Sequence, residues 1–485
     1  MKLANDALER VRHAFKGAVL GDPRRVQRLM RTVQKLAESP NSSFPQAMGS
    51  EADIEGAYRL MNNEHVTAEK LADAYANATA KRARGHARVL VIHDTTPCEF
   101  SHLDGSEVGY LNTGKAGFYA HYSLVVTADG TRRPLGVVNV EAHSRSKRPS
   151  KSKKKSTARK ASGADTAKKA DREFLRWSRG FSRATERLKK QTVINIADRE
   201  ADSYDLFAGC IQRKEHFVVR LRVTARNAVN AHGVKAKLRT IADACTGSVA
   251  REVPLSARKA GAARTARAAP KASKAHPVRD ARVAKLSFSA TRVELSRPRY
   301  AEAELETISL NLVRVFENDP PAGEKPIEWL LYTTEPVDTE EQVKDIVDMY
   351  RARWLIEECN KAIKTGCRYE DRQFETYEAL LNLFVMTLPV ACELLWLRSC
   401  CRADPEQPAT NALTDVQLRI LAHLVPKLAP RPTVHQALWA VASIGGHMRG
   451  NGEPGWQILY RGLAKLMAYE GGWLLREGAA GLVQG

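Results

Sequence analysis

An apolar, β-branched run that ends at a carboxylate constrains the fold of this chain most. Residues 89–92 of "VLVIHDTTPCEF" predict a buried strand, and Asp94 follows at the point where that strand should leave the core. The run "TVINIADRE" has the same form, because its predicted strand ends at Asp198. A single aspartate at a strand end is more typical of a turn or a helix cap. Asp94 and Asp198 therefore indicate a functional site only if further acidic groups lie near them.

Glu357 is the third acidic candidate. It lies in residues 339–366, whose pattern predicts one long helix capped by Thr339. Three carboxylates from two strand ends and a helix would repel one another unless a cation neutralised them. Mg²⁺ or Mn²⁺, which prefer oxygen ligands, would fit, and a pair of such ions can drive an in-line displacement at phosphorus. Glu357 could instead form an ordinary ion pair with Arg353 or Lys361, one helical turn away on either side.

The same predicted helix has a periodic set of polar residues. Tyr350, Arg353, Glu357 and Lys364 recur at steps of three, four and seven, which predicts one stripe on one helix. Cations beside a metal-binding glutamate suit a phosphodiester substrate, because they can hold the phosphates next to the scissile one. An ion-paired helix exposed to solvent would show the same spacing.

The charge balance points to a polyanionic partner. The 485 residues have a formal net charge of +21, with 43% apolar and 27% charged residues. A surplus of this size favours nucleic acid as the partner, although basic loops or a solvated basic surface could also produce it. The length predicts two to four domains. The eight cysteines are scattered, which argues against a structural zinc site, and the expected compartment is a reducing cytoplasm. The apolar run at 379–397 is interrupted by polar residues, which favours a buried core helix over a membrane span.

Basic residues concentrate in three places. Near the N-terminus, Asp22 and Pro23 predict the start of a helix on which Arg24, Arg25 and Arg28 are crowded. That helix could lie on a phosphate backbone or could simply be solvated. The other two places are low-complexity stretches at 144–160 and 256–285, and the first of these predicts a mobile loop. The strands between and after them predict a mixed α/β core with a β-rich interruption.

Several motifs together resemble one known family. The spacing of Tyr350, Arg353, Glu357 and Lys364 matches the Y-(2)-R-(3)-E-(6)-K signature of cut-and-paste bacterial transposases of the insertion-sequence-four family. "DTTPCEFSH" and "ADREADSYD" resemble the segments around the first and second aspartates of that family, and "VLGDPRRVQRL" resembles its N-terminal end-binding segment. "EGAYRLMNN" and "SIGGHMRGNGEPGWQILYRGL" are also similar, so the resemblance covers nearly the whole chain. It is closest to the transposon-five type.

This resemblance implies a fold and a domain order. The expected fold class is α/β: a ribonuclease-H-like mixed-sheet core with a β-rich insertion. Residues 1–75 would form an N-terminal helical DNA end-binding domain, and residues 76–378 the catalytic domain, with its insertion at about 215–337. Residues 379–485 would form a C-terminal helical dimerisation domain.

The resemblance also implies roles for particular residues. Asp94, Asp198 and Glu357 would be the catalytic, metal-binding triad, holding two Mg²⁺ ions for which Mn²⁺ can substitute. Arg353 and Lys364 would contact phosphates of the transposon end, Tyr350 would bond a phosphate, and Lys361 would add a further contact. Arg220 matches a basic residue near the active site. Trp329 matches a tryptophan that stacks on a base flipped out of the duplex, although a core aromatic on a strand is the alternative. Arg24, Arg25 and Arg28 would bind the end sequence.

The implied activity is that of a DNA transposase. Such an enzyme binds double-stranded transposon ends as a homodimer, hydrolyses them, forms and reopens a hairpin, and joins the 3′-hydroxyl ends to target DNA. The expected location is the cytoplasm, in association with the nucleoid. Two rivals remain open: a non-catalytic DNA-binding protein, such as a decayed transposase acting as an inhibitor, and a ribonuclease-H-like nuclease that only hydrolyses.

Overall fold

Two compact units make up the computed structural model of this chain. The first unit comprises Met1–Asn195 and Ala352–Gly485, and the second comprises Ile196–Arg351. The structure describes residues 10–40, 42–146, 163–247, 249–255 and 280–448, with short pieces between 454 and 473. Most of the two basic low-complexity stretches, residues 147–160 and 256–279, lies outside the described residues.

Short helices open the first unit. Helix α2 begins at Pro23, and the side chain of Asp22 accepts a hydrogen bond from the Arg24 backbone N–H, so the predicted cap is confirmed. Leu29, Val33 and Leu36 form its buried face, while its arginines remain at least partly exposed. The elements of this region are η1 (His13–Phe15), α2 (Pro23–Glu38), α3 (Phe44–Met48), α4 (Glu51–Met61) and α5 (Ala68–Ala83).

A sheet follows, with strands in the order β3-β2-β1-β4 within the first unit. Strand β1 (Arg88–Glu99) pairs antiparallel with β2 (Gly117–Thr127), which pairs antiparallel with β3 (Pro134–His143). Strand β4 (Thr192–Ala197) ends across the boundary between the units. The short helix α6 (Gly105–Val108) and the long helix α7 (Gly163–Arg187) complete this part, and α7 packs on β1, β2 and β3.

The expectation that Asp94 ends a strand is wrong. Strand β1 continues past Asp94 to Glu99, and Asp94 lies opposite Tyr122 in the register with β2. The β-branched residues Thr95 and Thr96 fit the pleated backbone, and pairing with β2 continues through them. Asp198, by contrast, directly follows β4, as predicted.

The single long helix expected over 339–366 is also wrong. Helix α11 (Glu340–Arg351) begins after Thr339, whose hydroxyl accepts the Gln342 backbone N–H at 3.3 Å, but it stops before Ala352. Helix α12 (Trp354–Lys361) then starts through tight bonds between residues three apart, from Leu355 N to Ala352 O and from Ile356 N to Arg353 O. A π-helical turn, η3 (Ala362–Gly366), follows. Tyr350 therefore lies on α11 in the second unit, and the predicted stripe is divided between elements.

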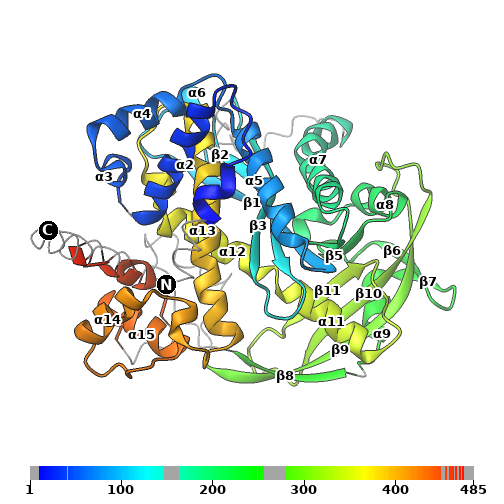
Figure 1. Cartoon of the computed structure of the whole chain (residues 1–485). Coiled ribbons are helices and arrows are strands. Elements are labelled where there is room, and N and C mark those ends of the chain that lie inside the picture. The colour runs from blue at the N-terminus through cyan, green and yellow to red at the C-terminus, as the bar shows by residue number, and fades with distance from the viewer. Residues whose placement is uncertain are drawn as a thin grey trace, which may run out of the picture. The chain divides into compact units, whose positions relative to one another are not determined.

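Helix α13 (Tyr377–Ala403) is the central helix of the first unit (Figure 1). It packs on α2, α4, α5, α12 and β3, and its residues Leu383, Phe384 and Leu388 are fully buried. Among the described residues one helix, Tyr377–Trp396, is long and apolar enough to cross a membrane, and 78% of its apolar window is buried inside the protein. The prediction of a buried helix here is confirmed. The remaining elements are η4 (Tyr369–Asp371), η5 (Ala409–Asn411), α14 (Asp415–Leu424) and α15 (Val434–Ile444).

The second unit is rich in antiparallel strands. Their order is β5-β11-β10-β9-β6-β7, and β8 pairs separately with β9. The bounds are β5 (His216–Arg220), β6 (Asn227–Asn230), β7 (Lys235–Lys237), β8 (Val249–Leu255), β9 (Arg282–Ser296), β10 (Thr307–Asn318) and β11 (Glu328–Thr333). Within the described residues, the helices of this unit are η2 (Arg199–Ala201), α8 (Tyr204–Gln212), α9 (Leu238–Ala244) and α11. The observed architecture is mixed α/β, as predicted.

Candidate active site

Strand β1 places Asp94 on the side of the sheet that faces helix α12. Side chains alternate along a strand, so His93 and Thr95 point the other way, where Thr95 accepts a hydrogen bond from Arg176 Nε at 3.0 Å. Asp94 is half-buried, and its Oδ2 accepts a hydrogen bond from Asn360 Nδ2 at 3.1 Å. The carboxylate is therefore oriented by a side chain of α12.

Tyr122 fixes the same asparagine from β2. Its hydroxyl donates to Asn360 Oδ1 at 2.7 Å, so Asn360 bridges the two strands and the helix. Burial, with Cys359 beside the ring, raises the pKa of Tyr122 well above its usual value. The hydroxyl consequently stays protonated and remains a donor.

Glu357 lies three residues before Asn360 on α12. Residues three apart are neighbours on a helix surface, so Asn360 brings the Asp94 carboxylate to the side of the helix that carries Glu357. Glu357 is half-buried and pairs with Arg353 Nη1 at 3.2 Å. One of the two ion pairs suggested by the sequence is therefore present. The other cation, Lys361, instead has its Nζ 5.6 Å from the centroid of the exposed Trp354 ring.

Asp198 belongs to the second unit, where it contacts the backbone of the residues that follow it. It is half-buried, and its Oδ1 accepts the Glu200 backbone N–H at 2.8 Å, which caps the short helix η2. Among the described residues, no group of three or more His, Cys, Asp or Glu side chains is arranged to hold a metal ion. Since Asp94 and Glu357 belong to the first unit and Asp198 to the second, the grouping of all three stays a prediction.

Lys364 lies on the π-helical turn after α12. Its Nζ donates to the backbone oxygen of Pro97 on β1 and pairs with Glu370 at 3.2 Å. Glu370 in turn accepts the Glu99 backbone N–H at 3.0 Å. The predicted phosphate-binding lysine is therefore hydrogen-bonded to β1, the strand that carries Asp94. π-helical turns of this kind often occur at functional sites.

Three further predicted residues lie close together in the second unit. The Trp329 and Tyr350 rings meet edge-on, with centroids 5.4 Å apart. Tyr350 is 4% exposed, whereas Trp329 is half-buried, so Trp329 is not a fully buried core aromatic. Arg220 Nη2 donates to the backbone oxygen of Glu328, the residue before Trp329, at 3.3 Å.

The three N-terminal arginines have different partners. Arg24 is highly exposed and pairs with Asp22 at 2.9 Å. Arg25 donates to the backbone oxygen of Leu20 at 2.7 Å, whereas Arg28 crosses to helix α4 and pairs with Asp53 at 2.9 Å. Of these three arginines, Arg28 is therefore the one whose ion pair joins α2 to α4.

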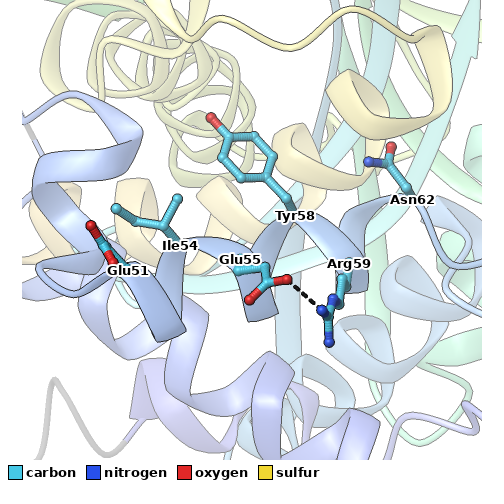
Figure 2. Close-up of a pocket in the computed structure, with 6 residues that line it drawn as sticks. All are labelled: Glu51, Ile54, Glu55, Tyr58, Arg59 and Asn62. Carbon is cyan, nitrogen blue, oxygen red and sulfur yellow. Dashed lines mark hydrogen bonds and ion pairs between the residues drawn. The ribbon is translucent and has the colours of Figure 1, made fainter.

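A surface hollow of about 570 Å³ lies along helix α4 (Figure 2). It contains none of the predicted catalytic residues. Its lining residues are Glu51, Ile54, Glu55, Tyr58, Arg59 and Asn62.

Sequence reasoning missed Asn360 and Asp53. Asn360 stands three residues after Glu357, so the helical spacing alone could have drawn attention to it. Asp53 carries no such signal, because its cationic partners lie on another helix and only the fold brings them together.

Comparison with protein families identifies two segments of the chain. Residues 9–66 match the transposase DNA-binding family, and residues 163–391 match the transposase DDE domain. The first segment contains Arg24, Arg25 and Arg28. The second contains Asp198 and Glu357, whereas Asp94 precedes it. A DDE domain implies a ribonuclease-H-like core, and DDE transposases use divalent metal ions.

Proposed function

We propose that this chain, a DNA-binding DDE transposase, is a cut-and-paste enzyme of the insertion-sequence-four family and of the transposon-five type. It binds the ends of its element, hydrolyses a phosphodiester bond there and joins the freed 3′-hydroxyl to target DNA. The observation that carries this proposal is the match of residues 163–391 to the transposase DDE domain, which contains Asp198 and Glu357. The bridge from Asp94 through Asn360 to the helix of Glu357 supports it.

Asp94, Asp198 and Glu357 would hold the metal. All three side chains are half-buried, so carboxylate oxygens, the ligands that Mg²⁺ and Mn²⁺ prefer, are reachable from solvent. Asn360 orients Asp94 by a hydrogen bond, as outer partners commonly orient metal-binding carboxylates. When bound, two Mg²⁺ ions would activate water and stabilise the leaving oxygen of the scissile phosphate.

The cations of this region would hold the DNA. Arg353 pairs with Glu357 at 3.2 Å, and its guanidinium would contact a phosphate of the transposon end beside the metal. Lys364 and Lys361 would bind neighbouring phosphates. In the second unit, Tyr350 would bond a phosphate, Arg220 would supply positive charge, and Trp329 would stack on the base flipped out during hairpin formation.

Each chemical step is a displacement at phosphorus. Water attacks first and releases a 3′-hydroxyl, which then attacks the opposite strand and closes a hairpin. A second water reopens the hairpin, and the same 3′-hydroxyl finally attacks a target phosphodiester. Each step forms one P–O bond and breaks another, so a single site serves all of them.

The partners follow from the reaction. Joining two ends to one target requires that both ends be held at once, and a homodimer through the C-terminal region 379–485 would do this. Because its substrate is DNA, the protein would act in the cytoplasm, in association with the nucleoid.

A strand-transfer assay tests the proposal. Labelled DNA flanking the coding sequence, target plasmid and Mg²⁺ are incubated with the full-length chain and with Glu357→Gln. We expect nicking and joining by the native chain, and loss of both in the variant with DNA binding retained. Glu340→Gln, which alters an exposed glutamate of α11, is the matched control and should act normally. Nicking without joining would favour a hydrolytic nuclease, and binding without nicking would favour a non-catalytic DNA-binding protein.

A further inference from the structure

Asp53 is a buried carboxylate surrounded by three cations of helix α2. The residue is 4% exposed. Its oxygens lie 2.9 Å from Arg28 Nη1, 2.8 Å from Arg31 Nη2 and 3.2 Å from Lys35 Nζ. Ser50, the N-cap of α4, donates its hydroxyl to Asp53 Oδ2 at 3.0 Å. Asp53 therefore ties the start of α4 to one side of α2.

The carboxylate is firmly ionised. Burial would raise the pKa of Asp53, but hydrogen bonds from Lys35, Ser50 and Arg31 lower it to about 2. One negative charge thus faces three positive ones, which leaves this cluster with a net positive charge. Residues 28, 31 and 35 are spaced by three and four, so their cations share one side of α2.

The cluster holds its arginines in place without hiding them. The side chains of Arg28 and Arg31 are 37% and 61% exposed, so both side chains remain accessible to solvent. Gly56 on α4 makes room for the first of them, because a Cβ built there would lie 2.7 Å from Arg28 Cζ. Arg28 therefore lies flat against α4, fixed on one side by Asp53.

We propose that Asp53 is a positioning residue for recognition of the DNA end: it fixes Arg28 and Arg31 in the orientation in which they contact that DNA. This inference rests on the proposed function, since it takes DNA as the ligand of α2. A guanidinium that is already held loses less side-chain entropy on binding and presents its donors in a defined direction. Defined direction matters for base edges and for register on the duplex, and much less for loose phosphate attraction.

The inference predicts an effect opposite in sign to simple electrostatics. If Asp53 were only a negative charge near DNA, its removal would strengthen binding to every sequence. If it positions the arginines, its removal weakens binding to the recognised sequence, while binding to other sequences stays equal or rises. The ratio of the two affinities separates the cases.

The experiment compares Asp53→Asn with Glu55→Gln in the full-length chain. Glu55 is an exposed carboxylate of the same helix that pairs with Arg59 (Figure 2), so Glu55→Gln removes the same charge without touching α2. The probes are the duplex that the native chain enriches from a random-sequence pool and a scrambled duplex of equal composition. We expect Asp53→Asn to lower the affinity ratio roughly tenfold, the scale of one lost base contact, and Glu55→Gln to preserve it.

Gly56→Ala provides a second, charge-neutral variant. The added methyl group displaces the flexible Arg28 guanidinium from its position against α4. We therefore expect this variant also to lower the affinity ratio, with an unchanged thermal midpoint. An unchanged ratio in both variants would overturn the positioning role, as would equal loss of both affinities together with a lowered thermal midpoint. If the native chain itself enriches no sequence, end recognition fails, and the role of Asp53 falls with it. Native enrichment with undiminished ratios in the variants refutes the positioning role alone.

Discussion

Asn360 connects the Asp94 carboxylate and the Tyr122 hydroxyl to helix α12, which also carries Glu357. Its amide donates to Asp94 and accepts from the buried Tyr122, so both ends of the side chain are used. An amide in this position can orient a carboxylate without competing for a cation, because it adds no charge of its own.

Replacing this amide should weaken metal use more than DNA binding. We expect Asn360→Ala to raise the Mg²⁺ concentration needed for half-maximal nicking by on the order of tenfold, since loss of an outer partner of a metal ligand typically has this effect. Titrating Mg²⁺ in a nicking assay measures it. Asn411→Ala, at an exposed asparagine, is the control, and equal Mg²⁺ requirements in native and Asn360→Ala chains would contradict the assignment.

Asp53 should make the stability of the first unit depend on acid. Its pKa in the folded chain, about 2, lies below the ordinary value of 3.8. A lowered carboxyl pKa stabilises the fold above the ordinary value, and this stabilisation is lost as the pH falls toward the folded pKa. We expect it to be roughly 2 kcal/mol at neutral pH and to fade between about pH 4 and 2. Urea unfolding of native and Asp53→Asn chains measures it; a difference in unfolding free energy that does not shrink with acid would refute it.

At the scale of elements, the π-helical turn sets where Lys364 lies. The turn ends at Gly366, which packs against the buried Tyr460 so closely that a Cβ there would lie 2.0 Å from the ring. The close packing leaves no room for a side chain, so the glycine is required by contact, not by an unusual backbone angle.

Gly366→Ala should therefore destabilise the first unit. The added methyl group has to push the Tyr460 ring aside, and overpacking of this kind costs on the order of 1–3 kcal/mol. Thermal unfolding of the full-length chain measures the loss. Gly85→Ala, which meets nothing within 4 Å, is the matched control. A Gly366→Ala chain as stable as this control would contradict the packing argument.

Sequence patterns predicted elements where local chemistry determines them. The cap at Asp22, the start after Thr339 and the strand before Asp198 each depend on a few neighbouring residues, and each was found. The continuation of β1 past Asp94 depends on pairing with β2, and the break between α11 and α12 falls where one compact unit ends and the other begins. Such features depend on contacts between distant residues, which periodicity does not reveal.

The candidate site shows the same division. Its acidic residues and cations were predicted by type and spacing, whereas Asn360, Asp53 and the partners of Lys364 were not. These partners become visible only when strands and helices far apart in the chain are brought together. The grouping of Asp94, Asp198 and Glu357 stays a prediction.

At the scale of the whole molecule, the net charge of +21 governs how the chain meets DNA. Each phosphate that a cation neutralises releases counterions, so affinity falls as salt rises. We expect non-specific DNA affinity to fall by on the order of a thousandfold between low and physiological salt, and Arg24→Ala to reduce the slope of log affinity against log salt by about 1. Titrations at several salt concentrations measure both. A salt-independent affinity would contradict a binding mode based on phosphate contacts.

The first unit is assembled from both ends of the chain, with the whole second unit between them in sequence. Its central helix α13 packs on α2, α4 and α5, and Arg10 pairs with Glu393 of that helix at 2.6 Å. On the ribosome, the early helices therefore emerge long before the segment that completes their core. A product truncated before α12 would lack both α13 and Glu357. The same late stretch of polypeptide therefore supplies the central helix of the core and an acidic group of the proposed chemistry.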